Sequence, residues 1–90
     1  MTLKIERISG EFGTQIRLSG DLRSEHLNQL KAEIERDRLP VILDMEELDL
    51  VDVEAVRFLN ACEAEGISVV RASPYIREWM SQERSKQPAR

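Results

Sequence analysis

Six acidic side chains lie between Asp44 and Glu54, and carboxylates at this density first suggest a metal site. Calcium-binding loops place oxygen ligands at alternate positions and need a glycine at their sharp turn. This stretch contains no glycine, and Leu48 and Leu50 interrupt the run of acids. We therefore predict a solvated acidic loop over residues 46–52 and no bound metal.

Cys62 and His26 are the candidates for nucleophilic or general-base chemistry. Cys62 falls on the apolar stripe of a predicted helix, where a cysteine behaves as a small, inert, buried side chain. His26 is the single histidine, so it cannot build a metal site alone. A hydrolase that combines Cys62 or His26 with Asp52 is the enzymatic alternative. The four glycines are scattered over predicted turns rather than grouped in a phosphate-binding loop, so we expect neither enzyme activity nor a cofactor.

Composition and charge narrow the classes of partner. The chain of 90 residues is 41% hydrophobic and 33% charged, which is typical of one small soluble domain. Residues 41–70 carry eight acids and one arginine, net −7, and this excludes nucleic acid as the main partner because phosphate contacts need clustered Lys and Arg. No apolar run approaches the roughly 18 residues of a membrane span, so we expect no membrane insertion. A single cysteine fits a reducing cytoplasm.

The hydropathy pattern predicts an alternation of strands and helices. Two half-buried strands should form an antiparallel hairpin, which the pair Ser19-Gly20 should end. A helix with a single apolar stripe follows, and then a buried strand, a second helix closed by Gly66, a third short strand and a helix opened by Ser73-Pro74. The expected ranges are 3–8 and 14–18 for the hairpin, 24–37, 40–45, 53–65, 67–71, and 74 onward. We predict one domain over residues 1–80 and a frayed polar tail over 81–90.

The second helix has two unlike faces. Asp52 is its expected N-cap, and Glu54 lies in its first turn, where an acid is favoured by the helix dipole. The side opposite the core stripe is small-sided and low in charge, and such a strip is suited to accepting a partner's surface. With the acidic loop, the predicted partner-binding residues are Asp49, Asp52, Val53, Glu54, Arg57, Asn60, Ala61 and Ala64. The alternative is that this strip is solvated or covered by the third helix.

Three stretches resemble the STAS domain family, which includes bacterial anti-sigma-factor antagonists. They are Ile16-Arg17-Leu18-Ser19-Gly20-Asp21-Leu22, then Val41-Ile42-Leu43-Asp44-Met45, and then Leu48 with Leu50-Val51-Asp52. The resemblance extends to about residue 80. It implies an α/β fold with a mixed sheet of about four strands and three helices packed on it. It also implies a non-enzymatic, protein-binding regulatory role in a bacterial cytoplasm.

The chain departs from the family pattern at the start of the second helix. In the antagonist branch, hydroxyl residues follow the aspartate that matches Asp52, and a partner kinase phosphorylates one of them. Here Val53 and Glu54 follow, and no serine or threonine lies between Ser24 and Ser68. The phosphorylation switch therefore does not carry over. Glu54 places a fixed negative charge near the position of the family's phosphate.

The resemblance leaves more than one partner open. One is an anti-sigma factor or its kinase, and another is a membrane transport assembly of which this chain would be a small accessory subunit. The same face of the second helix is also a candidate for pairing two copies as a homodimer. These expectations share one element: a protein surface docks on the second helix.

Overall fold

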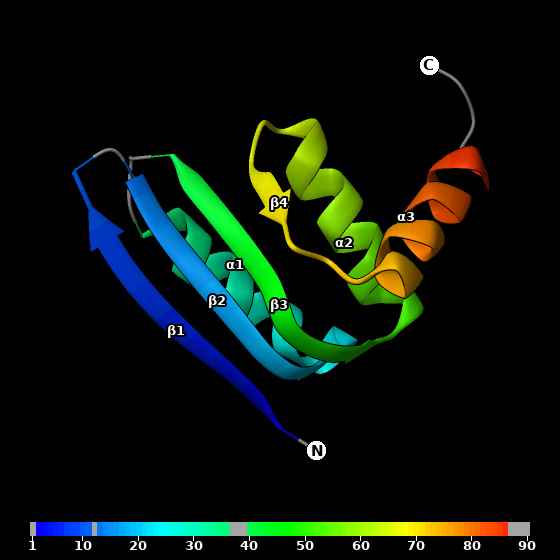
Figure 1. Cartoon of the computed structure of the whole chain (residues 1–90), viewed down its shortest axis with the longest axis horizontal. Helices are drawn as coiled ribbons and strands as arrows, with labels where there is room; N and C mark the ends of the chain where they lie inside the picture. Colours follow the sequence, from blue (N-terminus) through cyan, green and yellow to red (C-terminus); the bar gives the residue numbers. More distant parts are fainter. Residues whose placement is uncertain (1, 12, 37–39, 87–90) are drawn as a thin grey trace.

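Four strands form one sheet in the order β1-β2-β3-β4 (Figure 1). In this computed structural model, residues 2–11, 13–36 and 40–86 are described. β1 is antiparallel to β2, whereas β2, β3 and β4 are mutually parallel neighbours. The strands are β1 (Leu3–Gly10), β2 (Gly13–Leu22), β3 (Val41–Val51) and β4 (Ser68–Val70). The predicted hairpin and the predicted mixed sheet are both confirmed.

Three α-helices accompany the sheet, as predicted. A 3-10 turn, η1 (Ser24–His26), leads into α1 (Leu27–Glu35), so the first helix is shorter than expected. In Figure 1, α1 lies behind β2 and β3, and α3 packs on the far side of α2. The other helices are α2 (Val53–Ala64) and α3 (Pro74–Lys86). The fold class is therefore α/β, with a four-stranded mixed sheet and three helices.

The core lies where the strands meet the helices. Ile16, Leu18, Leu43 and Leu59 are fully buried there, with further buried side chains from every helix. Burying each large aliphatic side chain stabilises the fold by about 1.5–3 kcal/mol. The apolar alternation of β2 thus turns one of its faces toward the core.

Gly20 does not end β2, contrary to expectation. The strand continues to Leu22, and Gly20 adopts φ 95° within it. A Cβ atom at this position would collide with the carbonyl oxygen of Thr2, which accepts a hydrogen bond from Asp21 N. The glycine is needed for this close approach of two strands.

The acidic segment 46–52 is mostly strand, so the prediction of a loop there is wrong. β3 runs to Val51, which lies opposite Leu22 of β2. Leu48 and Val51 are also buried. Leu48 follows Met45 by three residues and Val51 follows Leu48 by three, and one of the two register shifts between β2 and β3 lies in each interval, which keeps all three side chains on the core side. Burial of these side chains holds the exposed acids between them in an extended strand.

The expectation of a frayed tail over residues 81–90 is wrong for residues 81–86. α3 continues to Lys86, while residues 87–90 lie outside the described part of the chain. Glu83 is only 3% exposed, and it accepts hydrogen bonds from Arg57 of α2 at 3.1 Å and from Lys86 at 3.2 Å. Polar contacts with α2 therefore continue the helix through a segment that has few apolar residues.

Candidate protein-docking groove

Asp52 joins the start of α2 to the end of β2. Its Oδ1 accepts a hydrogen bond from Ala55 N at 2.9 Å, and its Oδ2 accepts one from Ser24 N at 2.8 Å. Burial opposes the charge on this carboxyl, but the two backbone donors outweigh it and lower its pKa. The predicted N-cap is confirmed, and both carboxylate oxygens are engaged within the chain.

The outward face of α2 is divided by α3. Asn60 is 7% exposed; it donates to Met80 O at 2.9 Å and accepts from Arg84 at 3.0 Å. Arg57 of α2 likewise donates a hydrogen bond to Glu83 of α3. The prediction of a single open strip is therefore wrong at Asn60, because the unforeseen length of α3 covers it. Ala61 and Ala64 do remain exposed, as does Glu54.

The remaining predicted residues lie near the start of α2. Asp49 is exposed on β3, and Val53 is half-buried in the first turn of α2. Glu54 pairs with Arg57 at 3.4 Å, and both side chains are about half exposed. Such surface pairs contribute about 0–1 kcal/mol, so a partner could compete for either charge.

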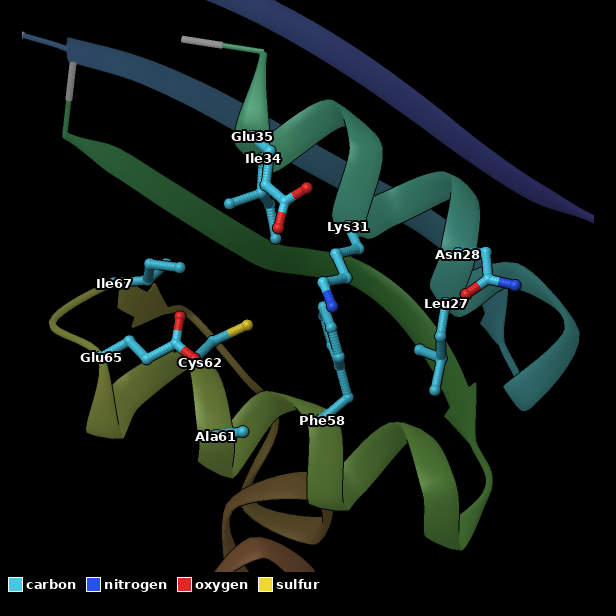
Figure 2. A pocket seen from close by; sticks show the side chains of 10 residues that line it. All are labelled: Leu27, Asn28, Lys31, Ile34, Glu35, Phe58, Ala61, Cys62, Glu65 and Ile67. Carbon is cyan, nitrogen blue, oxygen red and sulfur yellow. The ribbon is translucent and has the colours of Figure 1, made fainter. Parts of the chain in front are cut away.

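A groove lies between α1 and α2, and Figure 2 shows side chains from both helices along it. Its volume is about 410 Å³. Leu27 and Ile34 of α1 face it from one side, and Phe58 and Ala61 of α2 from the other, so much of its lining is apolar. The polar lining comes from Asn28, Lys31, Glu35 and Glu65, and the remaining residues are Cys62 and Ile67.

Of the residues that line this groove, Ala61 alone was among the predicted partner-binding residues. Cys62 was expected to be buried on the apolar stripe of the second helix. A partial signal was available, because Phe58 lies just beside the core stripe rather than within it. The participation of α1 depends on how two helices separated by β3 come together, which no local pattern specifies.

Cys62 is unsuited to nucleophilic chemistry. It is buried, and burial raises the pKa of its thiol to about 12, with the nearby Glu65 and Glu63 adding to the effect. Such a thiol is protonated at neutral pH, and the thiolate is the reactive form. His26 is occupied locally, where its Nδ1 accepts a hydrogen bond from Arg23 N at 3.2 Å. Neither residue has the setting that the hydrolase alternative requires.

A second polar cluster surrounds Asp44 on β3. Its fully buried carboxylate accepts two hydrogen bonds from Arg71, at 3.1 and 2.8 Å, and one from Gln15 at 2.7 Å. The Arg71 bonds are the main cause that lowers the pKa of Asp44 to about 2; burial opposes this effect, while Glu46 N and the charge of Arg17 support it. Arg71 adopts φ 59°, a left-handed conformation that costs a non-glycine residue about 1–3 kcal/mol. The bidentate ion pair offsets part of that cost.

Within the described ranges, no three His, Cys, Asp or Glu side chains come together in a way that could hold a metal ion. The acids of β3 are spread along an extended strand, which keeps them apart. In the same part of the chain, no helix has both the length and the apolar character needed to cross a membrane.

Comparison with known proteins gives likenesses to solved structures and no family. No family model matches the chain, and no curated protein does. Among solved structures, a similar chain is an uncharacterized protein of the DUF3478 family with a SpoIIAA-like fold from Shewanella loihica PV-4. The two are 16% identical with a TM-score of 0.45, and the match covers 92% of this chain and 77% of the other. This overlap is too loose to carry any property of that protein to this one.

Proposed function

We propose that this chain is a non-enzymatic, protein-binding regulatory module of the bacterial cytoplasm. Its docking site is the groove between α1 and α2, and its partner inserts the apolar face of an amphipathic helix. The groove carries this proposal, because it is a sizeable concave surface between two helices whose lining combines apolar and polar side chains. Helix-in-groove binding uses apolar anchors at i, i+3 or i+4, and i+7 along the inserted helix.

The charge around the groove defines the partner further. Glu35 and Glu65 line it against the single cation Lys31, and residues 41–70 as a whole are strongly acidic. A partner helix with lysine or arginine beside its apolar anchors would associate faster and in a preferred orientation. An anti-sigma factor, its kinase or a transporter subunit could each present such a segment.

Regulation by this module would not require phosphorylation at the start of α2. Glu54 already supplies an exposed negative charge there, and Val53 replaces the hydroxyl. Docking is then controlled by the amounts of the two proteins or by a switch elsewhere in the complex.

Ala61→Arg tests the groove because it places a long charged side chain at an exposed groove position. Peptides that form short amphipathic helices would be selected from a displayed library against the wild-type chain, and their affinities measured by titration calorimetry. We expect enrichment of apolar anchors flanked by Lys or Arg, and at least a tenfold loss of affinity, about 1.4 kcal/mol, for Ala61→Arg.

Ala64→Arg is the matched control, since Ala64 is equally exposed on α2 but does not line the groove. Ala32→Arg serves the same purpose on α1. Both controls should bind the selected peptides as the wild-type chain does. Failure to enrich any peptide, or equal binding by Ala61→Arg and Ala64→Arg, would remove the groove as the docking site.

A further inference from the structure

Among the residues that the structure describes, no strand lies along the outer edge of β1. β1 is the terminal strand of the sheet, and Figure 1 shows no labelled element beyond it. Its eight residues pair continuously with β2 from Leu3 to Gly10 without a register shift, and it contains no proline. Of the usual means of blocking an edge, β1 has charged side chains but no bulge, no proline and no short length, so its backbone ladder stays regular.

The pairing pattern identifies which backbone groups face outward. Asp21 N donates to Thr2 O, so Thr2 and Asp21 form a hydrogen-bonded pair of the β1–β2 ladder. Such pairs alternate along antiparallel strands, so Lys4 and Glu6 also direct their N–H and C=O groups toward β2. The backbone groups of Leu3 and Ile5, between them, point toward the outer edge.

The charges on β1 alternate in a self-complementary way. Lys4 and Glu6 lie on the same face of the strand, and Lys4 Nζ is 3.7 Å from Glu6 Oε2. Their side chains are 70% and 44% exposed. When an identical strand approaches antiparallel with Ile5 opposite its own copy, Lys4 faces Glu6 of the second copy and Glu6 faces its Lys4. Opposite charges directly across two strands stabilise their pairing.

The neighbouring registers are unfavourable. The backbone N–H and C=O groups that point outward from one copy can pair only with those that point outward from the other. The two nearest alternative registers therefore place the two-fold axis at Lys4 or at Glu6. Those two registers place Lys4 opposite Lys4 or Glu6 opposite Glu6, and like charges directly opposite are destabilising. The sequence of β1 therefore favours one antiparallel register among these three.

We propose that β1 pairs with β1 of a second copy of this chain, antiparallel about a two-fold axis at Ile5, to form a continuous eight-stranded sheet. This surface is distinct from the predicted dimer face on α2, part of which α3 covers. It uses none of the residues that line the α1–α2 groove, so both surfaces can be occupied at once.

Charge reversal across the axis gives a direct test. Lys4→Glu alone and Glu6→Lys alone each bring like charges together, so each variant should shift toward monomer in sedimentation analysis at low salt. Mixing the two variants should restore a dimer of one copy of each, because every facing pair is then complementary. Lys31→Glu and Glu25→Lys change the charge equally on exposed positions away from β1 and should leave the wild-type dimer intact.

Crosslinking tests the register independently. Lys4 and Glu6 of opposite copies would form a non-hydrogen-bonded pair with Cα atoms about 4.5 Å apart, within reach of a disulfide. A mixture of Lys4→Cys and Glu6→Cys chains should therefore form the mixed disulfide on oxidation much faster than either chain alone. A wild-type chain that remains monomeric at high concentration would overturn the proposal. A dimer that survives both single charge reversals, or one without preferential mixed crosslinking, would also overturn it.

Discussion

At the scale of single residues, Asp44 is a buried charge that side chains from two other parts of the chain hold in place. Its buried carboxylate is neutralised by Arg71 and held by Gln15, and its pKa is lowered to about 2. Because the pKa in the folded state lies below the ordinary value of 3.8, ionised Asp44 stabilises the fold above about pH 4. This contribution is lost as the pH falls from about 4 to 2.

Asp44→Asn should accordingly lower the free energy of unfolding at pH 7 by about 1–2 kcal/mol. This figure is below the full value of the pKa shift, because Arg71 is half exposed and solvent screens the pair. The difference from wild type should shrink between pH 4 and pH 2. Urea denaturation followed by circular dichroism at several pH values measures both effects.

Glu47→Gln is the control for this series, since Glu47 is an exposed carboxylate on the same strand. It should change stability by no more than about 0.5 kcal/mol at any of these pH values. A loss for Asp44→Asn that is the same at pH 7 and pH 2 would show that packing, rather than the ionised carboxylate, is responsible.

The sequence predicted the roles of residues whose partners lie close to them along the chain. It did not predict the roles of residues whose partners lie far away along the chain. Asp52 as N-cap follows from its place directly before a helical pattern, and Ser73 likewise accepts a hydrogen bond from Ile76 N at 3.3 Å. The partners of Asp44, by contrast, come from β2 and from the residue after β4. Its ion pair with Arg71 depends on strand pairing that neither residue's neighbourhood specifies.

At the scale of elements, the contact between α2 and α3 decides which surfaces are open. Arg57 and Asn60 of α2 meet Glu83 and Arg84 of α3, so the last turns of α3 contact α2 through polar groups. The apolar periodicity of α3 ends at Met80, and for this reason the sequence suggested a frayed tail. The length of α3 is set by polar contacts with α2, and a hydropathy pattern does not predict such contacts.

Asn60→Ala distinguishes a covered face from an open one. The buried amide donates to Met80 O and accepts from Arg84, so its removal should lower the free energy of unfolding by about 1–2 kcal/mol. Chemical denaturation at neutral pH measures this change. An exposed asparagine would give almost no effect, and that result would restore the single open strip predicted from the sequence.

Glu54→Gln provides the comparison within the same helix. Its ion pair with Arg57 is solvent-exposed, so the cost should stay within about 0–1 kcal/mol. A larger loss of stability for Asn60→Ala than for Glu54→Gln then shows that α3 buries Asn60. This comparison does not require a binding partner.

Elements with a clear period were well predicted, and their ends were not. β2 was foreseen from Ile16 and Leu18, but its continuation past Gly20 depends on the close approach of Thr2. β3 was foreseen to Met45, whereas its last part is extended only because bulged pairing with β2 buries Leu48. Both errors arise where an irregular ladder replaces simple alternation.

At the scale of the whole molecule, two surfaces remain for interaction. One is the acid-rimmed groove between α1 and α2, and the other is the regular outer edge of β1. The acidity of residues 41–70 was evident from the sequence, and it directed attention to α2. The groove itself required the packed structure, because its two walls are separated in the chain by all of β3.

The most direct test of groove docking is a map of backbone amide shifts as a selected peptide is titrated into isotopically labelled protein. If the peptide docks in the groove, perturbed amides should gather along its two walls. These are Leu27 and Lys31 of α1 and Phe58, Ala61 and Cys62 of α2. They should be absent from the same titration of Ala61→Arg and retained in that of Ala64→Arg. Perturbations that centre instead on α3 or β1, or that persist unchanged in Ala61→Arg, would contradict docking in the groove between α1 and α2.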